Sequence, residues 1–196
     1  MTTKHSRTPG RPRQFDSAQA VETAQHLFHS RGYDAVSVAD LTKAFGINPP
    51  SFYAAFGSKL GIYTRVLNRY RMTDAIPFEA LLRHDRPTAK CLIDVLMEAA
   101  RRYVADPDAA GCLILEGIHC NDRPARDAAC ELYITAENRI RAYIAGRYPQ
   151  EADRMTDFMG TLMVGLSAKS RAGYSMERLQ ETVLLAGEVL ERRLPG

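Results

Sequence analysis

The chain has no apolar run that approaches the roughly 18 residues needed to cross a membrane. Its first segment, MTTKHSRTPGRPRQ, is polar and basic, unlike a signal peptide. The sequence also lacks the patterns that would indicate an enzyme: it has no paired Glu-x-x-His motifs, no glycine-rich phosphate loop and no nucleophile elbow. These absences predict a cytoplasmic protein with no membrane association, no catalytic site and no cofactor.

Cysteine is also scarce, and its placement indicates neither a disulfide nor a closed metal site. The cysteines lie inside helical patterns without C-x-x-C spacing, so we expect reduced, mostly buried thiols and no bound metal. One stripe at helical spacing keeps an alternative open, a redox- or metal-responsive protein that uses Cys112, His119 and Cys120. Glu116 belongs to the same stripe, but a further ligand is missing. The four cysteines are Cys91, Cys112, Cys120 and Cys130.

Positive charge is concentrated in the first part of the chain. Residues 1–71 contain ten Lys and Arg against four Asp and Glu, whereas residues 72–196 contain sixteen against nineteen. A basic first part on a mildly acidic remainder predicts that only the first part meets a polyanion such as nucleic acid. With 45% apolar residues, the 196-residue chain can bury the core of one large or two small domains.

The stretch from Ser37 to Lys59 predicts two short helices that are separated by a tight turn. Ser37 is a suitable N-cap, and Asp40 three residues later gives a variant of the capping box. Gly46 ends this helix, because glycine adopts the left-handed conformation at low cost. Asn48 is expected to cap the next helix, which opens with two prolines. Two helices joined in this way form a helix-turn-helix, whose second helix can lie in the major groove of DNA.

About a dozen positions of this region also agree in type and spacing with a known family. They are Gly32, Tyr33, Ser37, Leu41, Ala44, Gly46, Ile47, Ser51, Phe52, Tyr53, Phe56, Ser58 and Lys59. In these positions the chain resembles the N-terminal domain of TetR/AcrR-family transcriptional regulators, from about Phe15 to Tyr70 and without a gap. The resemblance implies a DNA-binding transcriptional regulator of bacterial type. Its simplest form is a ligand-responsive repressor that binds a palindromic operator as a homodimer.

The resemblance further implies which residues meet DNA. Asn can read adenine and apolar Pro or Ala can touch a thymine methyl group, while hydroxyls and an ammonium suit phosphate. Asn48 cannot fully serve both as cap and as base reader, and prolines donate nothing, so we expect much of the specificity to come from DNA shape. The predicted base contacts are Asn48, Pro49, Pro50 and Ala54, and the predicted phosphate contacts are Ser37, Ser51, Tyr53 and Lys59.

Residues 1–14 predict a flexible basic arm beside this motif. They combine basic residues with prolines and a glycine, a composition that does not favour a helix. Arginine in a DNA minor groove benefits from the concentrated negative potential there. We therefore expect Arg11 and Arg13 to contact DNA.

The remainder of the chain predicts a helical bundle, so the fold class is all-α with about nine helices. Residues 15–71 would form the DNA-binding domain, with the helix-turn-helix at about 37–56, and residues 72–196 a ligand-binding and dimerisation domain. Apolar periodicity predicts helices over about 88–104, 108–120, 123–148, 151–173 and 175–194, with a connector over 73–87.

Two further sites are expected in this bundle. By the resemblance, an unidentified small-molecule effector would sit among helices spanning about 88–170 and would move the fourth helix. Its predicted walls are Met97, Tyr103, Leu115, His119, Tyr133 and Met163.

The last two helices carry more apolar surface than one hairpin needs, which predicts a second copy of the chain as partner. The predicted dimer contacts are Phe158, Leu162, Leu166, Leu179, Val183 and Leu190.

Overall fold

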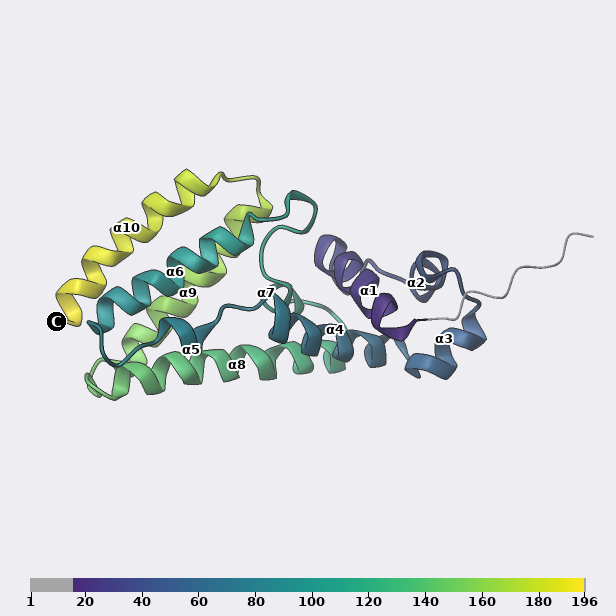
Figure 1. Cartoon of the computed structure of the whole chain (residues 1–196), viewed down its shortest axis with the longest axis horizontal. Helices are drawn as coiled ribbons and strands as arrows, with labels where there is room; N and C mark the ends of the chain where they lie inside the picture. Colours follow the sequence, from purple (N-terminus) through teal and green to yellow (C-terminus); the bar gives the residue numbers. More distant parts are fainter. Residues whose placement is uncertain (1–15, 196) are drawn as a thin grey trace, which may run out of the picture.

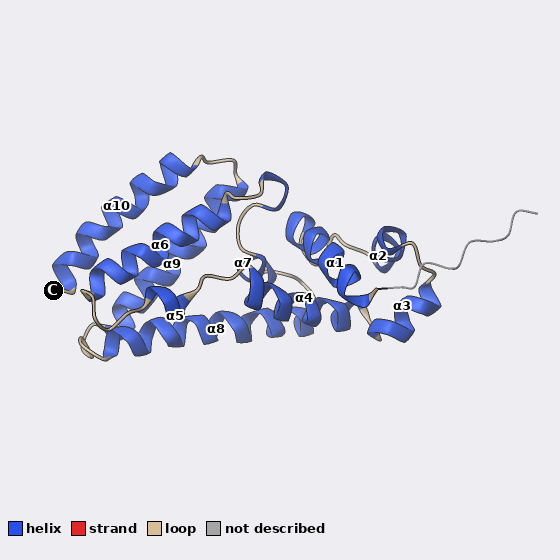
Figure 2. Ribbon diagram, in the orientation of Figure 1, coloured by secondary structure: helices blue, strands red, loops and turns tan. Residues whose placement is uncertain are grey.

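The computed structural model describes residues 16–195, and every regular element in this range is helical. Figure 1 shows an elongated molecule with a small group of helices at one end, and Figure 2 shows helices and loops without a strand in the described part. We call α1 to α4 the head and α5 to α10 the body. The elements are α1 (Ser17–Arg31), α2 (Val38–Phe45), α3 (Pro49–Phe56), α4 (Lys59–Thr73), α5 (Phe78–Leu81), α6 (Thr88–Tyr103), the 3-10 turn η1 (Pro107–Ala109), α7 (Leu113–Gly117), α8 (Arg123–Ala145), α9 (Ala152–Arg171) and α10 (Met176–Arg193).

The head is held together by aromatic and aliphatic side chains that recur at helical spacing. Phe28 of α1, Leu41 of α2 and Phe52 of α3 are completely buried. Each such burial stabilises the fold by about 1.5–3 kcal/mol. Phe52 and Phe56 lie one turn apart with ring centroids 5.4 Å from each other, which confirms that this side of α3 faces inward. The opposite side of α3 is consequently left for solvent.

Helix α4 belongs to the head and also packs on the body, where it contacts α7 and α8. Tyr63 is the centre of this junction, because its ring packs edge-on against Phe28 at 5.1 Å and against Tyr33 at 4.7 Å. Its hydroxyl lies against the α7 residue Gly117. A movement of α4 relative to the body is therefore also a movement of α1 and α3, which pack on it.

The body is a helical bundle in which α6 lies between α9 and α10, while α8 packs along α9 (Figure 1). The buried face of α6 recurs at helical spacing and includes Leu92, Val95, Leu96, Ala99 and Tyr103. Two of the ten α-helices, α5 and α7, span only four and five residues, so the described architecture agrees with an expectation of about nine helices. Across residues 16–195, no helix combines the length and apolar character that a bilayer crossing needs.

The sequence predicts one continuous helix over 108–120, and this is wrong. Gly111 has a left-handed backbone with φ of 85°, and its N–H donates to the carbonyl of Tyr103 at 2.8 Å. The next N–H, of Cys112, donates to the hydroxyl of Ser167 at 3.0 Å. These tertiary hydrogen bonds replace helical ones, so the segment divides into η1, an extended turn and the short α7.

The contact between α4 and α7 predicts a sharp cost for filling Gly117. An alanine Cβ there would lie 2.3 Å from the hydroxyl of Tyr63 and 2.8 Å from Cβ of Ala129. We expect Gly117→Ala to lower the free energy of unfolding by about 1–3 kcal/mol through overpacking. The matched control is Gly146→Ala, where the nearest atom would lie at 3.4 Å and the backbone is already helical. Urea unfolding of both variants tests this, and equal effects would contradict it.

Candidate functional site

Helix α2 begins with a complete capping box. The hydroxyl of Ser37 accepts a hydrogen bond from the N–H of Asp40 at 3.1 Å, and the carboxylate of Asp40 accepts from the N–H of Ser37 at 2.8 Å. The same carboxylate accepts from the Ser37 hydroxyl at 2.6 Å. These hydrogen bonds, followed by the charge of Arg31, lower the pKa of Asp40 to about 2. The entry to α2 is therefore fixed by local interactions.

The turn before α3 has the predicted form. Gly46 is left-handed with φ of 67° and ends α2, and the side chain of Asn48 caps α3 by accepting from the N–H of Ser51 at 2.9 Å. The cap occupies the oxygen of the Asn48 amide but leaves its nitrogen as the part that can donate to another group. A two-point contact with adenine needs both the oxygen and the nitrogen. Asn48 can therefore act toward DNA only as a donor, through its amide nitrogen, while the cap is kept.

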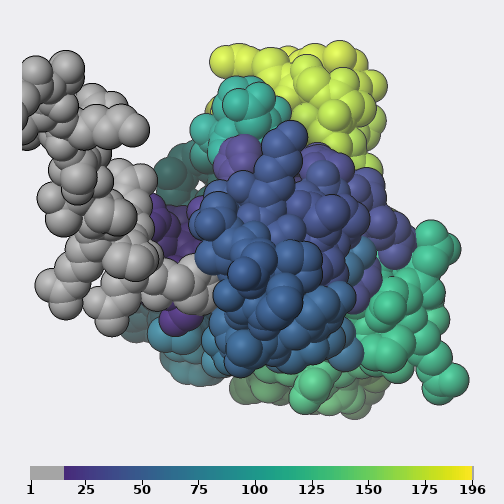
Figure 3. Space-filling model, turned by 90° about the vertical axis from the view of Figure 1, so that its right-hand side faces the viewer, coloured from purple at the N-terminus to yellow at the C-terminus, as the bar shows by residue number. Residues whose placement is uncertain are grey.

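The outer face of α3 is exposed and carries no charge. Figure 3 looks onto this end of the molecule, where the blue segment that includes α2 and α3 faces the viewer. Its polar groups are the hydroxyls of Ser51 and Tyr53, and the ring of Tyr53 packs edge-on against Phe52 at 5.4 Å. The exposed residues of this segment are Asn48, Pro49, Pro50, Ser51, Tyr53 and Ala54. The structure thus places these six of the ten predicted DNA contacts in one exposed segment.

Positive charge lies beside this face rather than on it. Lys59, the first residue of α4, is half-buried with its ammonium 4.0 Å from the ring centroid of Tyr33, and burial lowers its pKa. Lys43 in the last turn of α2 is exposed and was missed by the sequence analysis. The sequence pattern that indicates an outward-facing Lys43 is its position two residues after the buried Leu41, on the opposite side of α2. Arg11 and Arg13 lie outside the described residues.

A second site is an apolar cavity of about 70 Å³ inside the body. Four predicted wall residues line it: Tyr103, Leu115, Tyr133 and Met163. Two predictions are corrected. Met97 is not part of the lining, and His119 is exposed, because α7 ends before it and its side chain turns away from the core.

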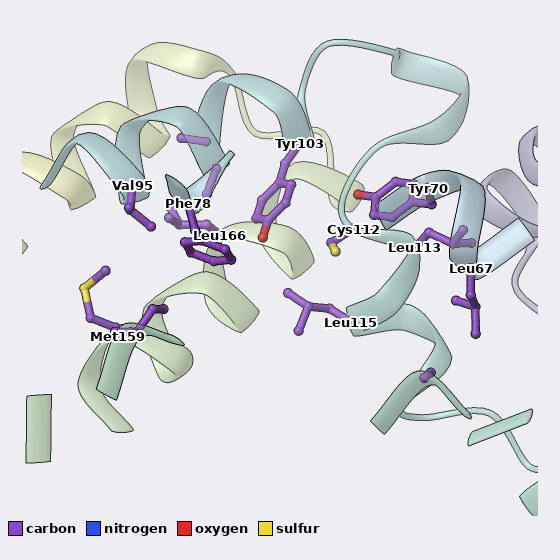
Figure 4. Close-up of a cluster of buried hydrophobic side chains, with 14 of the residues drawn as sticks. Leu67, Tyr70, Phe78, Val95, Tyr103, Cys112, Leu113, Leu115, Met159 and Leu166 are labelled. Carbon is purple, nitrogen blue, oxygen red and sulfur yellow. The ribbon is translucent and has the colours of Figure 1, made fainter. Parts of the chain in front are cut away.

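Polar groups line this cavity at few points. Figure 4 shows the hydroxyl of Tyr103 directed toward Leu115, with the sulfur of Cys112 and the hydroxyl of Tyr70 to one side of it. Glu137 also lines the cavity and was not among the residues predicted from the sequence. Its carboxylate accepts a hydrogen bond from the hydroxyl of Tyr133 at 2.5 Å, and both side chains are half-buried. The signal for Glu137 is its position one helical turn after Tyr133.

A polar cleft of about 480 Å³ lies between the head and the body, and it shares Tyr70, Asp74 and Arg102 with the apolar cavity. The carboxylate of Asp74 accepts from the side-chain amide of Gln25 at 2.8 Å, and Arg102 donates to the Asp74 carbonyl at 3.0 Å. Gln25 in turn accepts from Arg69 at 2.9 Å. The end of α4 therefore contacts both the cavity and, through Gln25, helix α1.

The outer face of α9 and α10 differs from the predicted one. Leu166, Leu179, Val183 and Leu190 are buried within the single chain, which corrects their assignment to an interface with another copy. They face α6, because α10 packs on that helix. Phe158 and Leu162 remain partly accessible on α9. The large apolar side chains that α10 exposes are Leu184, Leu185 and Val189, with exposed fractions of 56%, 66% and 41%.

The redox or metal alternative finds no support in this geometry. Cys120 is buried, and its thiol lies 3.5 Å from the carbonyl oxygen of Asp122. Burial raises the pKa of Cys120, which opposes the thiolate that a reactive sensor needs. Within residues 16–195, no three His, Cys, Asp or Glu side chains gather as a metal site would require.

The chain is similar to several transcriptional regulators. Residues 20–66 match the family described as bacterial regulatory proteins, tetR family. The HTH-type transcriptional repressor BdcR of Escherichia coli (strain K12) is 56% identical over 191 residues, which cover 97% of each chain. The repressor ComR of the same strain is 29% identical over 192 residues, covering 92% of this chain and 90% of ComR. A solved structure of the TetR family regulator CifR, a cysteine mutant complexed with 26-bp double-strand operator DNA, matches with a TM-score of 0.79 and 30% identity, covering 91% of this chain and 98% of CifR.

The capping box predicts a pH-dependent contribution to stability. The pKa of Asp40 is lowered in the folded protein, so its contribution is present above about pH 4, the ordinary Asp range, and is lost as the pH falls toward about 2. We expect Asp40→Asn to lower the melting temperature at pH 7 and to have a steadily smaller effect below pH 4. Asp127→Asn, which removes an exposed carboxylate of α8, is the control. A difference that stayed constant from pH 7 to pH 3 would contradict the prediction.

Proposed function

From the fact that the chain belongs to the tetR family of bacterial regulatory proteins, we propose that it is a cytoplasmic repressor with three properties. It binds a pseudo-palindromic operator, it does so as a homodimer, and it releases the operator when a small molecule occupies the body cavity. The observation that carries this proposal is the exposed, uncharged outer face of α3, which the caps at Ser37 and Asn48 hold in place.

The chemistry of this face suits one mode of reading. Pro49 and Ala54 can contact a thymine methyl group but donate no hydrogen bond, and Asn48 can only donate, through its amide nitrogen, while it caps α3. The hydroxyls of Ser51 and Tyr53 suit phosphates at the edge of the groove. Affinity then comes largely from Lys43, Lys59 and the predicted arm, and sequence preference comes largely from DNA shape and apolar contact.

A dimer is needed because a single short reading helix contacts too few bases for specific affinity. The exposed apolar side chains of α10 offer a contact surface, with Leu185 and Val189 one helical turn apart. On α9, a Cβ at Gly165 would meet no atom within 4 Å, so a partner helix can approach closely there. We infer that Leu184, Leu185 and Val189, with Phe158 and Leu162, form the dimer interface.

The cavity suggests how a ligand acts on the head. Its volume of about 70 Å³ is smaller than the roughly 150 Å³ of an engineered cavity that holds benzene. A ligand of that size must therefore displace the walls, which include Tyr70 and Asp74 at the end of α4. Displacing Asp74 also strains its hydrogen bond with Gln25 of α1. A few kcal/mol of preference for the displaced arrangement is sufficient to shift the head away from DNA.

If this proposal is right, the protein binds one class of operator in a strongly salt-dependent way. Selection from a random DNA pool should yield an inverted repeat, and binding to it should weaken steeply between 50 and 200 mM salt. We expect Lys59→Ala to weaken binding to all sequences similarly and to reduce the magnitude of the salt slope by about 1, because it removes one phosphate contact. Fluorescence anisotropy with labelled duplexes measures both quantities.

The control for this variant is Lys169→Ala in the body. Lys169 also stacks on a tyrosine, with its ammonium 4.5 Å from the ring centroid of Tyr174, but it belongs to α9. It should change neither affinity nor salt slope. Recovery of only sequence-independent binding, or equal effects of the two lysine variants, would count against the proposed reading surface.

The proposed dimer interface can be tested by placing a charge on α10. Leu185→Glu places a charge at the centre of the proposed interface, so we expect a folded monomer with greatly reduced operator affinity. The matched control is Ile134→Glu on α8, where the native side chain is also exposed, with a fraction of 53%. Light scattering should show a dimer for the control and a monomer for Leu185→Glu. A dimer in both cases would place the interface elsewhere.

A further inference from the structure

The walls of the body cavity are chiefly hydrocarbon. Phe78, Ile114 and Leu115 close it from α5 and α7, and Ile140 and Met163 close it from α8 and α9. Hydrocarbon walls favour a ligand whose body is apolar. Specificity must then come from the few polar groups among them.

The hydroxyl of Tyr103 stands out among these groups. Tyr103 is buried at the end of α6, and its oxygen has no hydrogen-bond partner that meets normal geometry among the described residues. Figure 4 shows this oxygen directed toward Leu115, with the sulfur of Cys112 to one side. A thiol is only a weak hydrogen-bonding group. Leaving a buried hydroxyl unpaired is unfavourable, and a ligand that accepts a hydrogen bond from it would remove that penalty.

The neighbouring polar groups are already engaged. The Cys112 side chain interacts with the hydroxyls of both Tyr70 and Tyr103, and Tyr70 has in addition a backbone partner at Leu113. Among the charged side chains of the lining, Arg102 pairs with Glu98 at 2.5 Å, and Asp74 accepts from Gln25 at 2.8 Å. The remaining charged group is Glu137, which accepts from Tyr133.

These pairings determine the charge that the cavity tolerates. Burial raises the pKa of Tyr70 and of Tyr103, so both are neutral phenols. The deep end therefore holds no counter-charge for an ionised ligand, and burying an unpaired charge is very costly. A carboxylate ligand would in addition meet the negative charges of Asp74 and Glu137 in the lining.

We propose that the effector is a small neutral molecule that is apolar except for one oxygen, which accepts a hydrogen bond from Tyr103, as a ketone would. This ligand class rests on the repressor function proposed above. The apolar part of the molecule packs against Leu115 and Met163. The carbonyl oxygen lies beside Tyr103 and Cys112, where it satisfies the hydroxyl that the unliganded fold leaves unpaired.

The test uses three probes of similar shape with the full-length protein. These are cyclohexanone, its hydrocarbon counterpart methylenecyclohexane, and the anion cyclohexanecarboxylate. Isothermal titration calorimetry should rank cyclohexanone first and the carboxylate last. In Tyr103→Phe, affinity for the ketone should fall about three- to tenfold, the effect of one neutral hydrogen bond, while affinity for the hydrocarbon stays the same or rises.

Tyr143→Phe is the matched control, because Tyr143 is a buried tyrosine outside the cavity lining and its hydroxyl already donates to the carbonyl of Arg83 at 2.7 Å. It should keep the preference for the ketone, and melting curves of both variants confirm that they are folded. A preference for the ketone that survives in Tyr103→Phe would overturn the proposed ligand class. So would tighter binding of the carboxylate, or failure of cyclohexanone to bind.

Operator release separates this proposal from the repressor function. If cyclohexanone binds in a Tyr103-dependent way but leaves operator affinity unchanged, the ligand class holds and effector-controlled release is wrong. If another compound releases the operator while cyclohexanone does not bind, release is supported and the ligand class is overturned.

Discussion

Helix α4 packs against the head on one side and against the body on the other, and this shared packing joins the two parts of the molecule. One side of this helix completes the core of the head through Tyr63 and its aromatic contacts with Phe28 and Tyr33. The same helix contacts α7 and α8, and its last turn reaches the body cavity through Tyr70. Because one rigid helix serves both parts, the head cannot change its position without disturbing the body. A tightly packed junction of this kind converts a small displacement at one end into a displacement at the other.

The head and the body differ in how completely their polar groups are hydrogen-bonded. In the head, the side chains of Ser37, Asn48 and Ser58 each accept a hydrogen bond from one first-turn amide of α2, α3 and α4, so local interactions hold the exposed face of α3 in place. In the body, one buried hydroxyl on Tyr103 is left without a good partner, and the cavity beside it is too small for a benzene-sized molecule. Unsatisfied polarity and tight walls are unfavourable for the unliganded fold. Both features suit the proposed effector site, because a ligand that fills the cavity has to move its walls.

The polar cleft between head and body supplies the connection between these two regions. Asp74 terminates α4, lines the cavity and accepts a hydrogen bond from Gln25 of α1. Further links hold α1 to the body: the ring of His29 lies 3.0 Å from the carbonyl oxygen of Gly111, and Arg171 donates to the carbonyl of His29 at 2.8 Å. Burial is the main cause that lowers the pKa of His29, so a neutral ring suits this contact. The junction is thus polar and directional, which favours a small number of discrete arrangements over continuous bending.

Features that depend on neighbouring residues could be predicted from the sequence alone. The caps at Ser37 and Asn48, the left-handed Gly46 and the inward pair Phe52 and Phe56 all follow from interactions within a few positions, and the structure shows each of them. The extents of the long helices followed from apolar periodicity for the same reason. Apolar periodicity indicates that a helix has an apolar face, but it does not indicate which other helix packs on that face.

Burial and hydrogen bonding between residues far apart in the sequence could be seen only in the tertiary structure. Leu179, Val183 and Leu190 have the pattern of an interface, yet they are buried against α6 in the same chain. The segment around Gly111 has helical periodicity, yet hydrogen bonds to Tyr103 and Ser167 break it. Tyr103 was a candidate from its sequence position, but its unpaired hydroxyl became visible only when Cys112 and Leu115 were placed beside it. Sequence spacing specifies which side chains share a face, whereas burial and hydrogen bonding depend on which other elements come to that face.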